Sequence, residues 1–259
     1  MSDFWLERPF HKTLPILENT LAQPSFGPSH GSASAPAADS LLTGQVAYWH
    51  MTNTADASGN GNTLTNTGGV SFASNGQVGK CATFGPASQL EIANASALQF
   101  RGAAFGVGFI WSMIDTENDA FSITTGNNGD HVEYQIAMLG GNMYFLMAAD
   151  DGDPVLVVQD TNLGTPGNGV RVLTFVWFDP TVGANGTGYV RSAKLSDSAL
   201  NAAVSSAASG AVTLLGDGDF VIASNEGNTI DEVLILNRIL TNAEMVRWFT
   251  NVKAGNVPV

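Results

Sequence analysis

From residue 41 onward the chain alternates short apolar segments with short polar turns, and this pattern predicts β-strands. Several segments place apolar residues at every second position, which is typical of a strand with one buried face. Turns rich in Gly, Asn and Asp separate the segments. We predict strands at residues 46–49, 81–84, 90–92, 105–113, 120–124, 131–137, 142–147, 154–159, 170–178, 187–191, 211–215, 219–223 and 231–236.

The number and spacing of these strands favour an all-β fold, a two-sheet antiparallel jelly-roll sandwich. The 29 glycines support this fold class, because tight turns need residues that tolerate a positive φ. Sandwiches of about 200–250 residues often form one domain. We therefore predict one jelly-roll domain at residues 41–259.

Helix is predicted at two places at most. Thr241 is a suitable N-cap, and Glu244 follows at the spacing of a capping box. Met245, Trp248 and Phe249 then share one face, so a short C-terminal helix is expected to pack on the sandwich. Residues 196–204 are a second, weaker candidate for a short helix.

Residues 1–40 differ from the rest and are predicted to form an extended arm and linker. They hold half of the chain's 10 prolines and end in the small-residue run Ser29–Ala38. A disordered tail is normally poor in large apolar residues, but this arm is not. It can pack on its own domain, dock on a neighbouring subunit or stay disordered. Its candidate partner-binding residues are Phe4, Trp5, Leu6, Phe10, Leu14, Ile16 and Leu17.

Charge and cysteine content exclude several classes of function. The net charge of −13 comes with only 10 basic residues, so we expect neither nucleic acid nor an anionic membrane as a partner. The single cysteine, Cys81, rules out an intrachain disulfide and is expected to be a small buried residue. The N-terminus lacks the pattern of a signal peptide, so synthesis in the cytoplasm is expected.

Three segments together resemble one known family. The first is Gly44–Trp49 with the turn Asp56–Asn62, the second is Gly79–Gly85, and the third is the strand around Ile230–Val233 with the capped helix that follows. In this order they resemble the laminin-G-like (concanavalin-A-like lectin/glucanase) jelly roll over roughly residues 41–252. The resemblance implies the sandwich fold and a role in binding or assembly. The segment Val170–Thr174 departs from the family's usual Trp-His pair, and the arm has no counterpart there.

The resemblance also implies a possible Ca²⁺ site. Hard cations prefer carboxylate and amide oxygens from a tight loop, and the ligands would be Asp56, Asn60 and Asn62, completed by Asp231 or Glu232. The alternative is a turn held by the hydrogen bonds of its own Asx side chains.

Catalysis is not expected. The jelly-roll glucanases need carboxylates that point at one sugar, whereas the adjacent Asp231 and Glu232 should point to opposite faces of a strand. Thr229 and Leu234 stand where further acids would be needed. The four histidines belong to no recognisable catalytic or metal-binding pattern.

Two non-enzymatic functions follow. The first is a virion component, such as a bacteriophage capsid decoration or tail-associated protein, whose arm binds protein subunits of a homo-oligomer or particle. The alternative is a carbohydrate-binding lectin module, with or without a calcium requirement, located outside the cell or at its surface. Its candidates for stacking on sugars are the aromatic residues Trp111, Tyr134, Tyr144, Trp177 and Tyr189.

Overall fold

The computed structural model describes residues 41, 43–113, 121–127, 132–139, 141–148, 154–212, 218–224 and 227–258, with the side chain of Asn127 excepted. The predicted arm lies outside this part of the chain. The prediction of two regions, 1–40 and 41–259, therefore stays a prediction.

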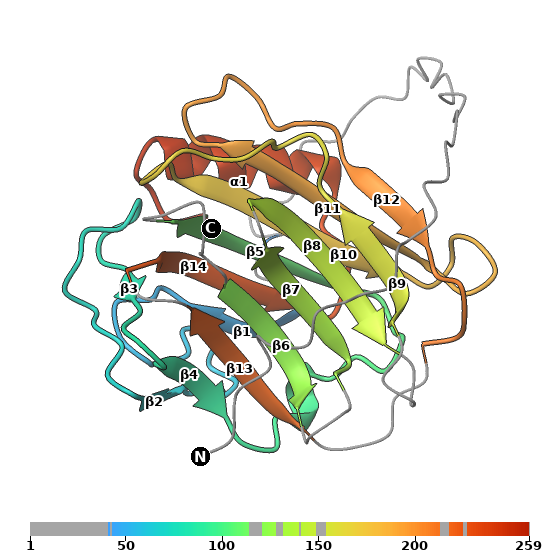
Figure 1. Cartoon of the computed structure of the whole chain (residues 1–259), viewed down its shortest axis with the longest axis horizontal. Coiled ribbons are helices and arrows are strands. Elements are labelled where there is room, and N and C mark those ends of the chain that lie inside the picture. The colour runs from blue at the N-terminus through green and yellow to red at the C-terminus, as the bar shows by residue number, and fades with distance from the viewer. Residues whose placement is uncertain are drawn as a thin grey trace. The chain divides into compact units, whose positions relative to one another are not determined.

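The described residues form two antiparallel sheets (Figure 1). The strands of the first sheet are, in order, β1 (Gln45–Trp49), β14 (Thr229–Leu236), β5 (Phe105–Ser112), β10 (Val172–Asp179), β11 (Thr187–Lys194) and β12 (Val204–Ala207), with β3 (Ala82–Thr83) paired to β14. Those of the second are β2 (Thr65–Thr67), β4 (Gln89–Ile92), β13 (Asp219–Ser224), β6 (Phe121–Asn127), β7 (Tyr134–Leu139), β8 (Asn142–Ala148) and β9 (Pro154–Gln159). The predicted two-sheet sandwich is confirmed.

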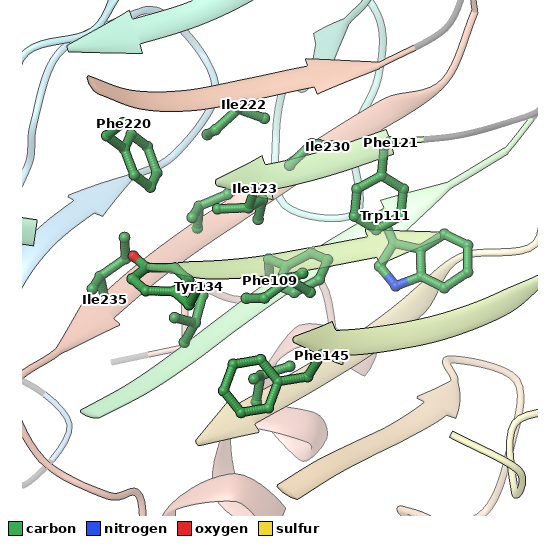
Figure 2. Close-up of a cluster of buried hydrophobic side chains, with 14 of the residues drawn as sticks. Phe109, Trp111, Phe121, Ile123, Tyr134, Phe145, Phe220, Ile222, Ile230 and Ile235 are labelled. Carbon is green, nitrogen blue, oxygen red and sulfur yellow. The ribbon is translucent and has the colours of Figure 1, made fainter. Parts of the chain in front are cut away.

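The main core lies between the sheets, as the alternation of apolar residues requires. Figure 2 shows aromatic and aliphatic side chains from β5, β6, β7, β8, β13 and β14 meeting there. The labelled members are Phe109, Trp111, Phe121, Ile123, Tyr134, Phe145, Phe220, Ile222, Ile230 and Ile235.

A second core lies on the other face of the first sheet, hereafter its outer face, under the helix α1 (Asn242–Lys253). Trp248 of α1 packs edge-on against Phe175 of β10, with ring centroids 5.1 Å apart. Gly108 of β5 makes room for this helix, because a Cβ at Gly108 would lie 2.3 Å from the Trp248 ring. The sheet can therefore bury both of its faces, which explains why β5 lacks polar side chains from Phe105 to Trp111.

The predicted capping box at the start of α1 is confirmed. The backbone N–H of Thr241 donates to Oε2 of Glu244 at 2.7 Å, and the N–H of Glu244 donates back to the Thr241 hydroxyl at 3.3 Å. Arg238 donates to the same carboxylate, 2.7 Å from Oε1. Among the described residues, neither α1 nor the short 3₁₀ turn η2 (Ser96–Leu98) combines the length and the apolar character needed to cross a bilayer.

The prediction of a helix at residues 196–204 is wrong. That segment forms turns and then enters β12. The carboxylate of Asp197 accepts a hydrogen bond from the backbone N–H of Lys194 at 3.0 Å, which closes a tight turn instead of starting a helix. The predicted strand at 211–215 is also absent at residues 211–212, and the remainder of it lies outside the described residues.

Candidate functional site

The Asp56 turn is held by hydrogen bonds to its carboxylate. Oδ1 accepts from the backbone N–H of Tyr48 at 3.0 Å and of Ser58 at 2.9 Å. Oδ2 accepts from the Ser58 hydroxyl and from the N–H of Asn62, both at 2.9 Å. Burial opposes ionisation of Asp56, but these bonds outweigh it and hold its pKa below the ordinary value.

The two asparagines of the turn direct their amide nitrogens at β1. Nδ2 of Asn60 donates to the carbonyl of Val46 at 3.0 Å, and Nδ2 of Asn62 donates to the same oxygen at 2.7 Å. The carbonyl of Asn62 in turn accepts from the indole N–H of Trp49 at 2.8 Å. The turn thus fastens itself to both ends of β1.

Asp231 and Glu232 lie in a β-bulge of β14. The register with β5 shifts between Asp231 and Leu234, and Glu232 has a left-handed φ of 50°. The contacts of both carboxylates are with groups on the outer face of the first sheet, where Tyr48 and Val78 belong to the core under α1. The expectation that these side chains point to opposite faces is therefore wrong, since the bulge interrupts the alternation.

Glu232 joins two side chains of the β1 edge. The Tyr48 hydroxyl donates to Oε2 of Glu232, and Nδ1 of His50 lies 3.1 Å from both carboxylate oxygens. The Tyr48 and His50 rings are 4.5 Å apart. The Glu232 side chain is only 1% exposed, whereas that of His50 is 36% exposed. The hydrogen bond with Glu232 raises the pKa of His50, and burial followed by the Glu232 charge raises that of Tyr48.

Asp231 holds a different segment. Its Oδ2 accepts from the backbone N–H of Gln77 at 2.7 Å and of Val78 at 3.1 Å, while its Oδ1 has no partner among the described residues. Burial raises the pKa of Asp231 to about 7. Gly76 allows this close approach, because a Cβ there would lie 2.5 Å from Oδ2.

The loop held by Asp231 reaches the end of α1. Nε2 of Gln77 donates to the carbonyl of Val252 at 2.7 Å, and Arg171 donates to Oε1 of Gln77 at 3.1 Å. The polar cluster formed by Tyr48, His50, Asp231 and Glu232 thus ties β1, β14, this loop and α1 together. Its contacts are those of a structural network.

The described residues do not pair this cluster with a nucleophile. Cys81 is 1% exposed, and its thiol lies 3.7 Å from the carbonyl oxygen of Ser74. Burial raises the pKa of Cys81, which disfavours the reactive thiolate.

The five predicted calcium ligands fall into two groups with different partners. Asp56, Asn60 and Asn62 bond to β1, whereas Asp231 and Glu232 bond to the 77–78 backbone and to Tyr48 and His50. Across the described ranges, no group of three or more His, Cys, Asp or Glu residues is arranged to hold a metal ion. The hydrogen bonds fit the structural-turn alternative better than an oxygen cage, and calcium binding itself stays a prediction.

The five aromatic candidates separate by burial. Trp111 and Tyr134 are at most 1% exposed and belong to the core between the sheets. Tyr144, Trp177 and Tyr189 are half-buried. Trp177 and Tyr189 form a cross-strand pair between β10 and β11, and their rings stack with centroids 4.9 Å apart and planes 5° apart.

Sequence reasoning missed two arrangements. It assigned no role to His50, whose partner Glu232 lies 182 positions away. It also treated Trp177 and Tyr189 as separate candidates. The i, i+2 relation of Tyr189 to Arg191 on the predicted strand 187–191 was the available signal that these two share a face.

Comparisons with known proteins show a likeness of fold. No family model and no curated protein matches the chain. The structure is similar to the binding domain of botulinum neurotoxin DC in complex with SialylT (TM-score 0.60, 9% identity, 82% of this chain and 52% of that one). It is also similar to the binding domain of botulinum neurotoxin serotype C1 (TM-score 0.61, 9% identity, 82% of this chain and 53% of that one). A third similar structure is the binding domain of botulinum neurotoxin DC in complex with rat synaptotagmin II (TM-score 0.57, 10% identity, 82% of this chain and 52% of that one).

The chain spans about half the length of these domains. At this identity the match establishes the architecture and carries over no site. The chain therefore shares, at low sequence identity, the two-sheet antiparallel sandwich fold of part of the binding domains of botulinum neurotoxins.

Proposed function

We propose that the sandwich is a non-enzymatic recognition domain that binds glycans. The observation that carries this proposal is the stacked pair Trp177 and Tyr189, two half-buried aromatic rings held on an outer face of the sandwich. A rigid pair of this kind offers apolar area at a low cost in conformational entropy. The fold supports the proposal by analogy, since one similar domain is described in complex with SialylT.

The polar cluster supports a non-enzymatic role. Tyr48, His50 and Glu232 bond to one another, and Asp231 bonds to the backbone of a neighbouring loop. The two carboxylates are buried and bond within the protein, and His50, the partly exposed member, bonds to Glu232. General acid–base catalysis would require one of them to face a substrate within hydrogen-bond reach.

The virion hypothesis depends on the arm, and the arm lies outside the described residues. It stays a prediction, together with location in a virion, outside the cell or at its surface. Deleting residues 1–28 tests it: assembly into a particle or oligomer should be lost while the domain at residues 41–259 stays folded. Assembly of the truncated protein would contradict the arm hypothesis.

A glycan array tests the proposed function. The 259-residue chain, labelled at its amines, is applied to arrayed neutral and sialylated oligosaccharides, with the same protein unfolded by heat as the control. We expect a subset of glycans to retain the folded chain, and free glycan to compete in solution. If the folded chain is retained no better than the unfolded control on any glycan, the proposal is wrong.

A further inference from the structure

We propose that the open ring face of Tyr189, backed by Trp177, is the docking platform for a neutral sugar ring. This inference rests on the proposed glycan-binding function and assigns it a site and a ligand class. The platform is defined as Trp177 and Tyr189, with Asp179, Arg191 and Ser205 around them. The strands β10, β11 and β12 supply all five residues.

The register determines which side of the pair is open. Trp177 pairs with Gly106 of β5, and a Cβ at Gly106 would lie 3.0 Å from the carbonyl oxygen of Arg238 and 3.8 Å from the nitrogen of Leu240. The 238–240 segment therefore passes over the sheet beside Trp177. Tyr189 lies on the opposite side of the pair, toward the edge strand β12.

The neighbour of Tyr189 on that side is small. Tyr189 pairs with Ser205 of β12, and Ser205 is exposed. One face of the Tyr189 ring stacks on Trp177, so its other face is turned toward this short side chain. A flat apolar face with room beside it suits the C–H face of a pyranose ring.

Polar groups flank the pair at both ends. Asp179 follows Trp177 by two residues on β10, and Arg191 follows Tyr189 by two residues on β11, so all four lie on the outer face. The Asp179 carboxylate is held by the backbone N–H and the hydroxyl of Thr181, which donate to its Oδ1 at 2.9 and 2.6 Å. The Asp179 carboxylate can accept a hydrogen bond from a sugar hydroxyl at its end of the pair, and Arg191 bounds the other end.

The charges favour a neutral ligand over a sialylated one. The guanidinium of Arg191 already donates to the carbonyl of Asn201 at 2.6 Å and to Oδ1 of Asn242 at 2.5 Å. Asp179 adds a negative charge beside the ring, and the whole chain carries −13. A sialic acid carboxylate would meet repulsion at short range and in the overall field.

The size of the platform argues against a protein partner at this place. Stable protein interfaces bury about 800 Å² on each side. The large exposed hydrophobic residues among those described lie scattered on separate elements and do not extend the pair into such a surface. They are Leu139, Val182, Val246 and Val257.

Substitution of Tyr189 tests the platform. The affinity of a neutral glycan selected on the array is measured by titration calorimetry for the wild-type chain and for Tyr189→Ala, Tyr189→Phe and Tyr144→Ala. We expect Tyr189→Ala to weaken binding at least tenfold and Tyr189→Phe to retain it, because the ring face makes the contact. Tyr144, the half-buried candidate on the second sheet, is the competing site, and Tyr144→Ala should bind as the wild type does if Tyr189 is the platform. Far-ultraviolet circular dichroism and melting temperature establish that each variant is folded.

The outcomes separate the site from the function. If the wild type binds a glycan and folded Tyr189→Ala binds it equally well, the platform is wrong and the glycan-binding function stands. If the wild type binds no glycan, the proposed function fails. The sialylated form of the same glycan should bind at least tenfold more weakly, and Asp179→Asn should narrow that difference. Equal affinity for the two forms would overturn the assignment of a neutral ligand.

Discussion

The hydroxyl of Tyr48 donates a hydrogen bond to the carboxylate of Glu232, 184 positions further along the chain. The bond joins β1 to the bulge of β14, and Glu232 is fully buried there. A buried carboxylate that loses a donor bears a desolvation cost. The first strand of the sandwich and the last are thus coupled by a charge-assisted contact as well as by their backbone pairing.

Removing that hydroxyl should destabilise the sandwich. We expect Tyr48→Phe to lower the free energy of unfolding by about 1–3 kcal/mol, the range for leaving a buried acceptor without its donor. Urea unfolding followed by circular dichroism measures the change. Tyr144→Phe is the matched control and should leave the free energy of unfolding within about 0.5 kcal/mol of the wild type. Equal effects of the two substitutions would contradict the role given to Tyr48.

The stability of the protein should be greatest at mildly acidic pH. Burial raises the pKa of Asp231 and of Glu133 to about 7, and the Glu232 hydrogen bond raises that of His50. A raised folded-state pKa contributes stability below the unfolded pKa, and that contribution is lost as the pH rises through the folded value. Between the unfolded-state pKa and the folded-state pKa of each such group, the free energy of unfolding falls by up to about 1.4 kcal/mol per pH unit.

Carboxylates with lowered pKa values limit this trend on the acid side. Burial raises the pKa of Asp56 and of Glu244, but hydrogen bonds outweigh it in both residues. They hold the pKa of Asp56 below its ordinary value and lower the pKa of Glu244 to about 2. Their contribution is present above the unfolded pKa and is lost as the pH falls through the folded value. Urea midpoints from pH 3 to pH 9 should therefore pass through a maximum on the acid side of neutrality. Asp231→Asn and Glu133→Gln should each make the urea midpoint fall less steeply at pH values above this maximum. A maximum at pH 8 or higher would be inconsistent with this account.

Gly108 is expected to be essential for the docking of α1. In Gly108→Ala the new methyl group would lie 2.3 Å from the Trp248 ring, so the helix must shift. Overpacking of this kind costs about 1–3 kcal/mol. Gly85→Ala is the control, because no atom lies within 4 Å of its Cβ position and its φ is not in the left-handed region. Thermal melting compares the two, and equal melting temperatures would show that Trp248 does not pack as described.

Calcium is expected to leave the melting temperature unchanged if hydrogen bonds alone hold the Asp56 turn. A cation that binds only the native state would raise the melting temperature. The scan is run with millimolar Ca²⁺ and with a chelator, for the wild type and for Asp56→Asn. A rise in the wild type that Asp56→Asn abolishes would establish a calcium site and reverse the structural interpretation of the turn.

The sequence predicted the parts of this fold that depend on local patterns. The alternation along β4 and the capping box at Thr241 and Glu244 are encoded within a few residues, and both were recovered. The short edge strands β2 and β12 were missed, because their polar residues carry no alternation. The 196–204 segment has helical composition, but Asp197 forms a turn that overrides this preference.

The candidate sites depended on contacts that local patterns do not encode. The carboxylates of Asp231 and Glu232 share a face only because a bulge with a left-handed Glu232 breaks the strand. The residues next to Asp231 and Glu232 in the sequence do not predict that bulge. The stacking of Trp177 on Tyr189 follows from the register of β10 and β11, which long-range packing sets.

Mapping a bound glycan on the protein tests the central claim most directly. Backbone amide and side-chain chemical shifts of the isotope-labelled chain are followed by nuclear magnetic resonance during titration with an array-selected neutral glycan. We predict that the largest changes fall on the Trp177 indole, on Tyr189 and on Ser205. Changes confined to the outer face of the second sheet, or no changes at glycan concentrations that saturate the array signal, would contradict recognition at this face.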